Sequence, residues 1–184
     1  MIAPGAVPEL RTRRLKLRKF KPDDVHVFWE IWSDAETVRY WSDVPLTDFK
    51  EAEALLQKEL ELSEKGGFVT WGIADLVSDE LMGKFTLFNF SEINRRAEVG
   101  YILARRHWRR GYLSEVMERM LDFAFNELDL HRLEADSDPD NQASLALLEK
   151  FGFQREGLFR ERWWIDGRWC DSVMLGLIRP SSDS

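Results

Sequence analysis

A basic turn in the middle of the chain is the part of this sequence best suited to bind an anion. Four arginines lie within six residues of one another and flank His107 and Trp108: Arg105, Arg106, Arg109 and Arg110. Gly111 follows and leads into apolar residues at helical spacing. A helix N-terminus offers backbone N–H groups without intrahelical partners, and guanidinium groups add charge-assisted contacts to phosphate. The turn therefore predicts a diphosphate ligand, although a solvated basic patch with an ordinary glycine turn fits the local pattern equally well.

Two common nucleotide-binding motifs are missing from this turn. It has neither the Gly-x-x-x-x-Gly-Lys-Ser/Thr of a P-loop nor the Gly-x-Gly-x-x-Gly of a dinucleotide fold. Nucleotide hydrolysis and hydride transfer therefore lose support as functions.

The segments before the basic turn are predicted to form two helices and most of a sheet. The helices are expected over residues 24–33, with capping by the carboxylate of Asp24, and over 47–65, ending at Gly66 and Gly67. Strands are expected at 15–20, 68–77, 81–90 and 97–103. The second and third of these are expected to form a hairpin closed by Ser78, Asp79 and Glu80.

The segments after the turn are predicted to form two helices, a strand and a hairpin. One helix runs from Gly111 to about Leu128, and a shorter one over 141–150 is closed by Gly152. Residues 131–135 form a strand between them, and Asp166-Gly167 marks the turn of a hairpin within 153–178. The order of elements predicts an α/β sheet of mixed strand direction.

The composition fits one globular domain. The chain has 184 residues, of which 44% are hydrophobic and 32% charged, so a single domain over 1–184 is expected, with flexible ends at 1–12 and 180–184. The net charge of −7 disfavours a nucleic-acid partner.

With no export signal and no long apolar run, we expect a cytoplasmic protein without a membrane partner. One cysteine and three histidines provide no metal set, and Cys170 is expected to be a small buried hydrophobe.

Two motifs in the expected order resemble those of the GNAT superfamily of acetyltransferases. Residues 97–103 resemble the family's fourth strand, and Trp108-Arg-Arg-Gly-Tyr-Leu113 stands at its pyrophosphate motif, commonly Gln/Arg-x-x-Gly-x-Gly/Ala. Asp140-Asn-Gln-Ala-Ser144, followed by 148–153, is similar to the family's Asn-x-x-Ser and E-K-x-G-F signature. Trp108 in place of Gln or Arg is usual in the RimJ/RimL-like branch, which contains ribosomal-protein N-terminal acetyltransferases. The chain is identified as a member of that branch.

The resemblance implies a fold, a cosubstrate and a reaction. The fold is a central mixed, mostly antiparallel twisted sheet of about seven strands, flanked by about four helices. The reaction moves an acetyl group from acetyl-CoA to a primary amine by direct attack, with no covalent enzyme intermediate. The family's acceptors include protein N-termini, small amines, amino acids and antibiotics, so the sequence leaves the acceptor open. A homodimer is a further expectation for this branch.

The resemblance also implies where acetyl-CoA binds. Its pyrophosphate is expected at the turn, on a set of consecutive residues: Trp108, Arg109, Arg110, Gly111, Tyr112, Leu113 and Ser114. The free edge of the strand at Tyr101, Ile102 and Leu103 would pair with the pantetheine amide. Asn141 would hydrogen-bond the pantetheine arm, and Ser144 would lie near the sulfur.

The catalytic groups are less well defined, because the chain departs from the family pattern. Many members place a tyrosine where this chain has Leu148, and some place a glutamate where it has Trp163. Ser144 is therefore the remaining candidate donor to the leaving thiolate, unless it only caps its helix. Glu98 is the candidate general base, unless it is an exposed glutamate paired with Arg95 or Arg96.

Two other functions remain compatible with the sequence. The missing tyrosine and glutamate allow a CoA-binding regulator without catalysis. The aromatic residues near the predicted acceptor groove, such as Trp163, Trp164 and Trp169, also allow a non-enzymatic interaction domain, although such residues at strand spacing are more often core.

Overall fold

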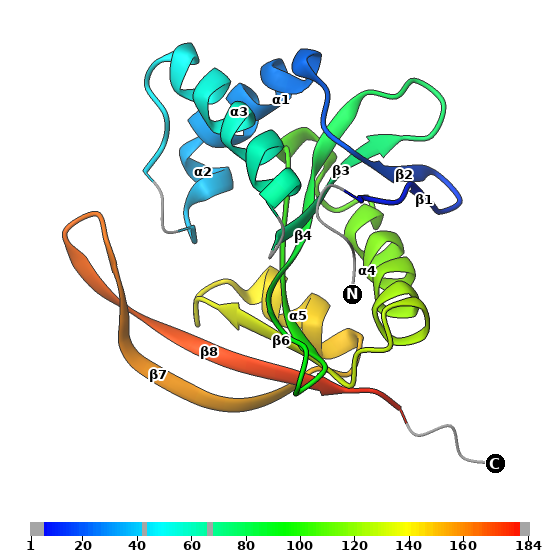
Figure 1. Cartoon of the computed structure of the whole chain (residues 1–184). Helices are drawn as coiled ribbons and strands as arrows, with labels where there is room; N and C mark the ends of the chain where they lie inside the picture. Colours follow the sequence, from blue (N-terminus) through cyan, green and yellow to red (C-terminus); the bar gives the residue numbers. More distant parts are fainter. Residues whose placement is uncertain (1–5, 42–43, 66–67, 181–184) are drawn as a thin grey trace.

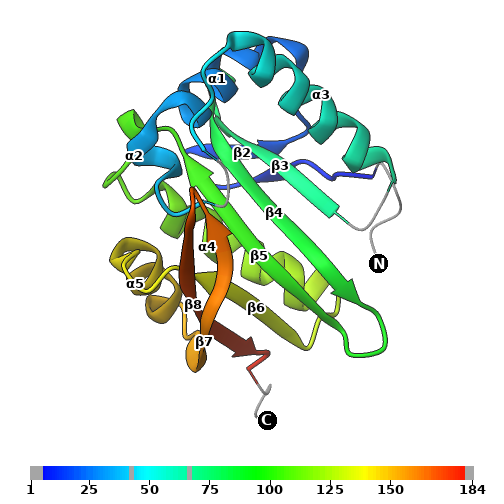
Figure 2. The same cartoon turned by 90° about the vertical axis from the view of Figure 1, so that its left-hand side faces the viewer.

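The fold is one twisted sheet with helices on both faces. The computed structural model describes residues 6–41, 44–65 and 68–180, and its eight strands follow the order β1-β2-β3-β4-β5-β6-β8-β7. Every neighbouring pair is antiparallel except β5 and β6, which are parallel. Helices α1, α2 and α3 lie together above the sheet in Figure 1, whereas α4 and α5 cover its other face (Figures 1 and 2).

The strands and helices have the following bounds. The strands are β1 Leu10–Arg11, β2 Leu15–Arg18, β3 Phe68–Asp75, β4 Leu81–Ser91, β5 Arg96–Leu103, β6 Arg132–Ser137, β7 Gln154–Ile165 and β8 Arg168–Ile178. The helices are α1 Val25–Ser33, α2 Ala35–Val38, α3 Phe49–Lys65, α4 Tyr112–Asp122 and α5 Gln142–Lys150. Short 3₁₀ turns lie at Pro22–Asp24 and Arg105–His107, and a π-helical turn at Phe123–Glu127.

The predicted α/β class and mixed sheet are confirmed, and both predicted hairpins are present. Asp166 and Gly167 have φ of 46° and 76°, which is the backbone that a two-residue hairpin turn requires. Gly152 closes α5 at φ 90°, as expected. The predicted stop at Gly66 and Gly67 lies outside the described residues. Within the described part, no helix is long and apolar enough to cross a membrane.

The predicted end of the helix after Gly111, near Leu128, is confirmed, although the helix keeps α geometry only to Asp122 and continues to Glu127 as the π turn. The expected flexible N-terminal end was wrong in part. Strand β1 lies within the segment expected to be flexible, where Leu10 pairs with Leu17 and is 4% exposed. The four-residue α2 had no sequence prediction, because it is too short to show a periodicity.

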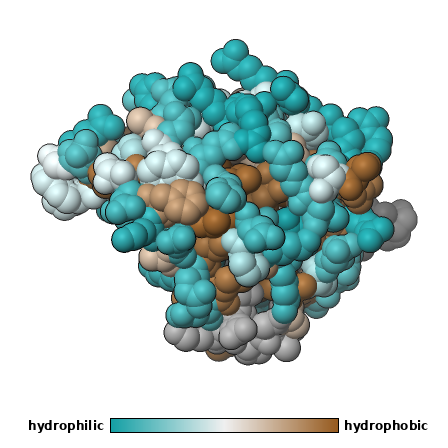
Figure 3. Space-filling model, turned by 90° about the horizontal axis from the view of Figure 1, so that it is seen from above, coloured by the Kyte–Doolittle hydropathy of each residue, from teal (hydrophilic) through white to brown (hydrophobic). Residues whose placement is uncertain are grey.

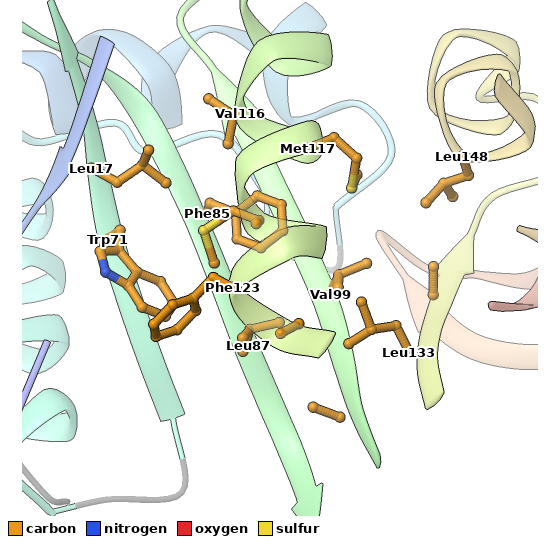
Figure 4. Close-up of a cluster of buried hydrophobic side chains, with 14 of the residues drawn as sticks. Leu17, Trp71, Phe85, Leu87, Val99, Val116, Met117, Phe123, Leu133 and Leu148 are labelled. Carbon is orange, nitrogen blue, oxygen red and sulfur yellow. The ribbon is translucent and has the colours of Figure 1, made fainter. Parts of the chain in front are cut away.

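Two hydrophobic clusters, one on each face of the sheet, fix the positions of the helices. The larger lies under α4 and α5, and Figure 4 shows Val116 and Met117 on two sides of α4, with Met117 on the side toward Leu148 of α5. The smaller joins α1 and α3 to the opposite face. From the side of these helices the surface is mostly hydrophilic, and apolar area shows in separate patches between the polar side chains (Figure 3). Each face of the sheet therefore has its own hydrophobic core, packed against different helices.

The parallel strands β5 and β6 stay together for only three residues. Arg96, Ala97 and Glu98 are in register with residues 132–134, and beyond Glu98 the two strands have no pairing. Strand β6 continues along β8 as far as Ser137 instead. The strands therefore open into a wedge whose β5 side presents an unpaired edge.

A buried carboxylate holds the start of α1 against the sheet. Asp24 was expected to cap that helix, but it accepts no hydrogen bond from an N–H group of α1 and instead accepts one from Lys21 N at 2.7 Å, at the start of the preceding 3₁₀ turn. Its two oxygens accept hydrogen bonds from Arg18 Nη1 and Nη2, each at 2.9 Å, and both side chains are 6–7% exposed. Asp79 in the β3–β4 turn accepts a third bond from Arg18 Nε at 2.6 Å. Burial alone would raise the pKa of Asp79, but hydrogen bonds from Lys21, Lys16 and Arg18 hold this pKa well below its usual value.

Replacing Asp24 by Ala should lower the free energy of unfolding by about 3 kcal/mol, because the guanidinium of Arg18 stays buried with only Asp79 left as a carboxylate partner. Urea unfolding followed by circular dichroism measures the change. The neighbouring Asp23 is exposed, and Asp23→Ala should cost less than about 0.5 kcal/mol. Equal losses for the two variants would show that the buried ion pair contributes nothing specific.

Candidate active site

The basic turn has the geometry of an anion site. Gly111 is the N-cap of α4 with φ 74°, a backbone that residues with a side chain rarely adopt. Within the described residues, none of the backbone N–H groups from Arg109 to Ser114 has a hydrogen-bond acceptor, whereas Glu115 N–H already donates to Gly111 O at 3.2 Å. A row of free donors at the positive end of a helix is suited to a diphosphate.

The four arginines of the turn divide into two pairs. Arg105 and Arg106 form ion pairs with carboxylates of neighbouring elements, Arg105 with Asp34 and Arg106 with Glu30 and Glu80. Arg109 and Arg110 form none within the described part of the chain and are exposed. The second pair is therefore the one available to a bound anion.

Two further cations reach this turn from other parts of the chain. Arg14 is fixed by Glu115, with Nε donating to Oε2 at 2.7 Å, and its guanidinium lies over the Tyr112 ring at 4.5 Å. Arg14 also donates from Nη1 to Arg110 O at 3.2 Å. Lys150, at the end of α5, donates to Ser114 Oγ at 3.1 Å. The sequence analysis missed both, because only the fold brings them to the turn.

Trp108 and His107 hold the loop between β5 and α4 in place. The indole Nε1 of Trp108 donates to Leu103 O at 2.8 Å and so ties the loop back to the end of β5. Both ring nitrogens of His107 are buried without a hydrogen-bond partner in the described residues, and the ring packs edge-on against Tyr112. Burial, helped by Arg106 and Arg110, lowers the pKa of His107 to about 4. The imidazole is therefore neutral at neutral pH, although the sequence analysis gave this residue no role.

The unpaired edge of β5 is short. The carbonyl of Ile102 faces β4, since a Cβ placed on Gly83 would lie 2.1 Å from it. Main-chain groups alternate sides along a strand, so those of Tyr101 and Leu103 point into the wedge. Leu103 O already accepts from Trp108, which leaves the main chain of Tyr101 as the group best placed to pair with an extended ligand.

Helix α5 closes the wedge from the other side. Asn141 is its N-cap, and its Oδ1 accepts a hydrogen bond from Ser144 N at 3.1 Å. The amide nitrogen of Asn141 has no hydrogen-bond acceptor among the described residues, and Asn141 and Ser144 both line the cavity described below. Ser144 Oγ lies 2.9 Å from the hydroxyl of Tyr101. The residues expected to contact the pantetheine arm therefore lie around one opening.

A cavity of about 420 Å³ begins at this wedge and runs under α3 to the β7–β8 hairpin. Glu98 lines it, half-buried, and accepts a hydrogen bond from Asn89 Nδ2 at 3.1 Å. The alternative expectation, that Glu98 pairs with Arg95 or Arg96, is wrong, because those arginines bind Asp129 and Glu134. One carboxylate oxygen of Glu98 remains without a hydrogen-bond partner in the described residues.

Asp136 is a second half-buried carboxylate on this cavity, and it fastens the hairpin to β6. Its Oδ1 accepts a hydrogen bond from Ser172 Oγ, and its Oδ2 accepts one from Trp163 Nε1 at 3.2 Å and pairs with Arg162 Nε at 2.9 Å. Burial raises the pKa of Asp136, with nearby Glu98 acting in the same direction and Arg162 opposing. The sequence analysis missed Asp136, since a lone aspartate in a short strand carries no pattern.

Several aromatic residues line the cavity, and others do not. Tyr40, Trp41, Phe88 and Trp163 are among the lining residues. Trp164 and Trp169 instead pack against each other outside it, with ring centroids 5.0 Å apart and over half of each side chain exposed. Cys170 is half-buried on the cavity wall, so its expected burial in the core was wrong.

Comparison with known proteins agrees with this geometry. The family model for an acetyltransferase (GNAT) domain matches residues 14–154. The chain belongs to the GNAT acetyltransferase family. The uncharacterized N-acetyltransferase p20 of Bacillus licheniformis is 36% identical over 170 residues, which cover 92% of this chain and 96% of the relative. As a member of the family, the chain is an N-acetyltransferase that uses acetyl-CoA.

Solved structures show the same fold. A GNAT-family acetyltransferase from Bacillus anthracis superposes with a TM-score of 0.82 at 23% identity, covering 93% of this chain and 98% of the other. The spermidine N-acetyltransferase of Vibrio cholerae, determined in complex with CoA and spermine, superposes with a TM-score of 0.76 at 26% identity, covering 89% and 95% of the two chains. The predicted fold class is thereby confirmed.

Replacing Arg109 and Arg110 together by Ala should weaken acetyl-CoA binding by about 10- to 100-fold, the loss expected for one charge-assisted contact. Gly111→Val should abolish binding, because a β-branched residue is strained at φ 74°. Calorimetric titration of the purified protein measures both. Arg105→Ala is the matched control and should bind within about twofold of the unmodified protein, since Arg105 is 63% exposed and paired with Asp34. A loss as large for Arg105→Ala would contradict the division of the arginines.

The stability of the protein should depend on His107 below neutral pH. The folded pKa of about 4 lies below the unfolded value of about 6.5, so the unfolded chain binds the extra proton between these values and stability falls as pH falls. His107→Phe keeps a ring against Tyr112 and should flatten this part of the profile by about 1 kcal/mol per pH unit at most.

Urea unfolding at several pH values between 4 and 7 measures the effect of His107→Phe. The exposed His26 supplies the control, and His26→Gln should leave the slope unchanged. Parallel profiles for the unmodified protein and His107→Phe would rule out a buried neutral imidazole.

Proposed function

We propose that this protein acetylates a primary amine by direct attack on acetyl-CoA, with Glu98 as general base and Ser144 as hydrogen-bond donor to the leaving sulfur. The observation that carries the proposal is that both groups line one cavity, Glu98 from the point on β5 where its pairing with β6 ends and Ser144 from α5. The amine attacks and the thiolate leaves at the same carbonyl carbon. The reaction therefore needs a base beside the amine and a hydrogen-bond donor beside the sulfur.

The turn and the wedge fit acetyl-CoA as the cosubstrate. The free N–H groups from Arg109 to Ser114, with Arg109, Arg110 and Arg14, would hold the pyrophosphate. Tyr101 and Asn141 would hold the pantetheine arm along the β5 edge. The motifs of the turn and of α5 support membership of the RimJ/RimL-like branch, and with it a protein N-terminal amine as the acceptor.

The charge of the cavity favours an acceptor that carries positive charge beyond the reacting amine. Its cations, Lys84 and Arg162, are already paired with Glu59 and Asp136. Three lining carboxylates have no cationic side-chain partner within the described residues: Glu98, Asp138 and Asp171. A free amino acid, whose carboxylate would enter this acidic space, is disfavoured.

A polyamine is the second candidate acceptor. The aromatic and acidic lining suits an extended organic cation, because ammonium groups are attracted both to carboxylates and to ring faces. The Vibrio cholerae relative that acts on spermidine gives the same indication. A basic N-terminal peptide and a polyamine share this chemistry, and only turnover distinguishes them.

A panel of amines tests the proposal, with CoA release followed by a thiol reagent. Basic N-terminal peptides or polyamines should be turned over, whereas free acidic amino acids should not. Turnover of no amine despite tight acetyl-CoA binding would overturn the proposal and make the protein a CoA-binding regulator.

With an active acceptor in hand, Glu98→Gln should lower kcat/KM by about 100-fold and leave the Kd for acetyl-CoA unchanged, because removing a general base affects the proton transfer and not the binding of the cosubstrate. Steady-state kinetics and calorimetry measure the two quantities. Glu92, exposed in the β4–β5 turn, supplies the control Glu92→Gln, which should retain full activity. Full activity of Glu98→Gln would remove Glu98 as the base.

A further inference from the structure

The hydroxyl groups of Tyr101 and Ser144 form a pair inside the wedge. They lie 2.9 Å apart, although the residues are 43 positions apart in the sequence and belong to β5 and α5. Both line the cavity. The ring of Tyr101 is stacked on that of Phe85, with centroids 6.1 Å apart, and Phe85 is 1% exposed. The phenol is therefore held by the hydrophobic core and presented to Ser144.

The direction of the hydrogen bond follows from the surroundings of the two groups. Burial raises the pKa of Tyr101 to about 12, so its hydroxyl keeps its proton throughout the neutral range. A phenol is also a stronger hydrogen-bond donor than an alcohol. The stronger donor of the two is thus Tyr101, which favours the arrangement in which Tyr101 donates to Ser144 Oγ. In that arrangement the hydrogen of Ser144 is free to point into the cavity, since Ser144 Oγ has no other partner in the described residues.

Side-chain alternation along β5 separates this pair from the proposed base. Val99 and Leu103 belong to the cluster under α4 and α5, and Tyr101 packs against the same cluster, whereas Ile102 belongs to the cluster on the opposite face. Glu98 alternates with the first set and so projects to the face of Ile102. The base and the hydroxyl pair thus approach the wedge from different faces of one strand.

Helix α5 presents no second group that could serve the leaving sulfur. Leu148, one turn after Ser144, is apolar and 1% exposed. The hydroxyl of Ser144 is therefore the donor that α5 offers to the wedge, and an isolated alcohol is a weak one. Hydrogen bonds in a chain polarise one another, so a hydrogen bond donated by Tyr101 makes the hydroxyl of Ser144 a stronger hydrogen-bond donor.

We propose that Tyr101 is a positioning residue for acetyl transfer, whose hydroxyl orients and polarises that of Ser144 toward the departing sulfur. The inference rests on the proposed function. As the amine nitrogen bonds to the acetyl carbon, the carbon–sulfur bond breaks and its electron pair passes to the sulfur. The amine proton passes to Glu98, and the thiolate is stabilised by the Ser144 hydrogen bond until it takes up a proton on release. Tyr101 itself gives up no proton.

The ionisation of bound CoA tests this role without an acceptor. Ultraviolet absorbance of the thiolate, recorded across pH with saturating CoA, gives the pH at which the bound thiol ionises. The thiol should ionise at lower pH in the unmodified protein than in Tyr101→Phe or Ser144→Ala, by about one pH unit for each. The double variant should shift no further than Ser144→Ala, because Tyr101 acts through Ser144.

Three control measurements separate the role of Tyr101 from effects on CoA binding or on the cavity wall. Calorimetry should show that Tyr101→Phe and Ser144→Ala bind CoA within about twofold of the unmodified protein, since the pyrophosphate turn is intact. Tyr40→Phe, which also removes a phenol hydroxyl from the cavity wall, should leave the thiol ionisation unchanged. With an active acceptor, Tyr101→Phe should lower kcat by about 5- to 10-fold while KM for acetyl-CoA stays the same.

The outcomes separate this inference from the proposed function. If the unmodified protein does not bind CoA, both fail. If CoA binds and its thiol ionises at the same pH in the unmodified protein and in Tyr101→Phe, the positioning role of Tyr101 is wrong while the proposed function stands. A larger shift in the double variant than in Ser144→Ala would show that Tyr101 acts on the sulfur independently and would also overturn the proposal.

Discussion

The three-residue parallel contact between β5 and β6 is the constraint on which the site depends. The ion pair of Arg96 with Glu134 joins the two strands at the closed end. Beyond Glu98 each strand pairs only on its other side, β5 with β4 and β6 with β8. The opening therefore costs the hydrogen bonds that the facing edges of β5 and β6 leave unmade, and a bound extended ligand can restore those of β5. A sheet paired along its whole length would have no such edge to offer.

Everything that surrounds the opening is anchored to the rest of the fold. Helix α4 places its N-terminus beside the end of β5 because Val116 and Met117 are buried against the sheet, and Trp108 ties the intervening loop to Leu103. Asp136 holds the β7–β8 hairpin against β6, so the far wall of the cavity is fixed by a half-buried carboxylate. In the turn itself, Arg109 and Gly111 both have positive φ, so the backbone conformation there is a special one. The free backbone donors are thus preorganised on rigid elements.

Local pattern predicted the elements well and predicted their mutual contacts poorly. The strand periods, the Asp166-Gly167 turn and the amphipathic helix after Gly111 each depend on neighbours in sequence, which is why they were found. The division of the arginines could not be found, because Glu30, Glu80 and Asp34 reach Arg105 and Arg106 only in the folded chain. The end of α-helical geometry at Asp122 also has no local signal, since the apolar spacing continues through Phe125.

The electrostatics of the site follow from where the fold places its few unpaired charges. The chain carries a net charge of −7, yet Arg109 and Arg110 are left without carboxylate partners beside the helix N-terminus, within the part that the structure describes. Along the cavity that begins at the wedge, Glu98, Asp138 and Asp171 have no cationic side-chain partner among the described residues. A phosphate group and an ammonium group entering this site would therefore be attracted to different parts of it, the phosphate to the turn and the ammonium to the cavity. This separation of charge is what a site for a phosphate-bearing acetyl donor and a cationic acceptor requires, because the two reactants must approach one carbonyl carbon from different directions.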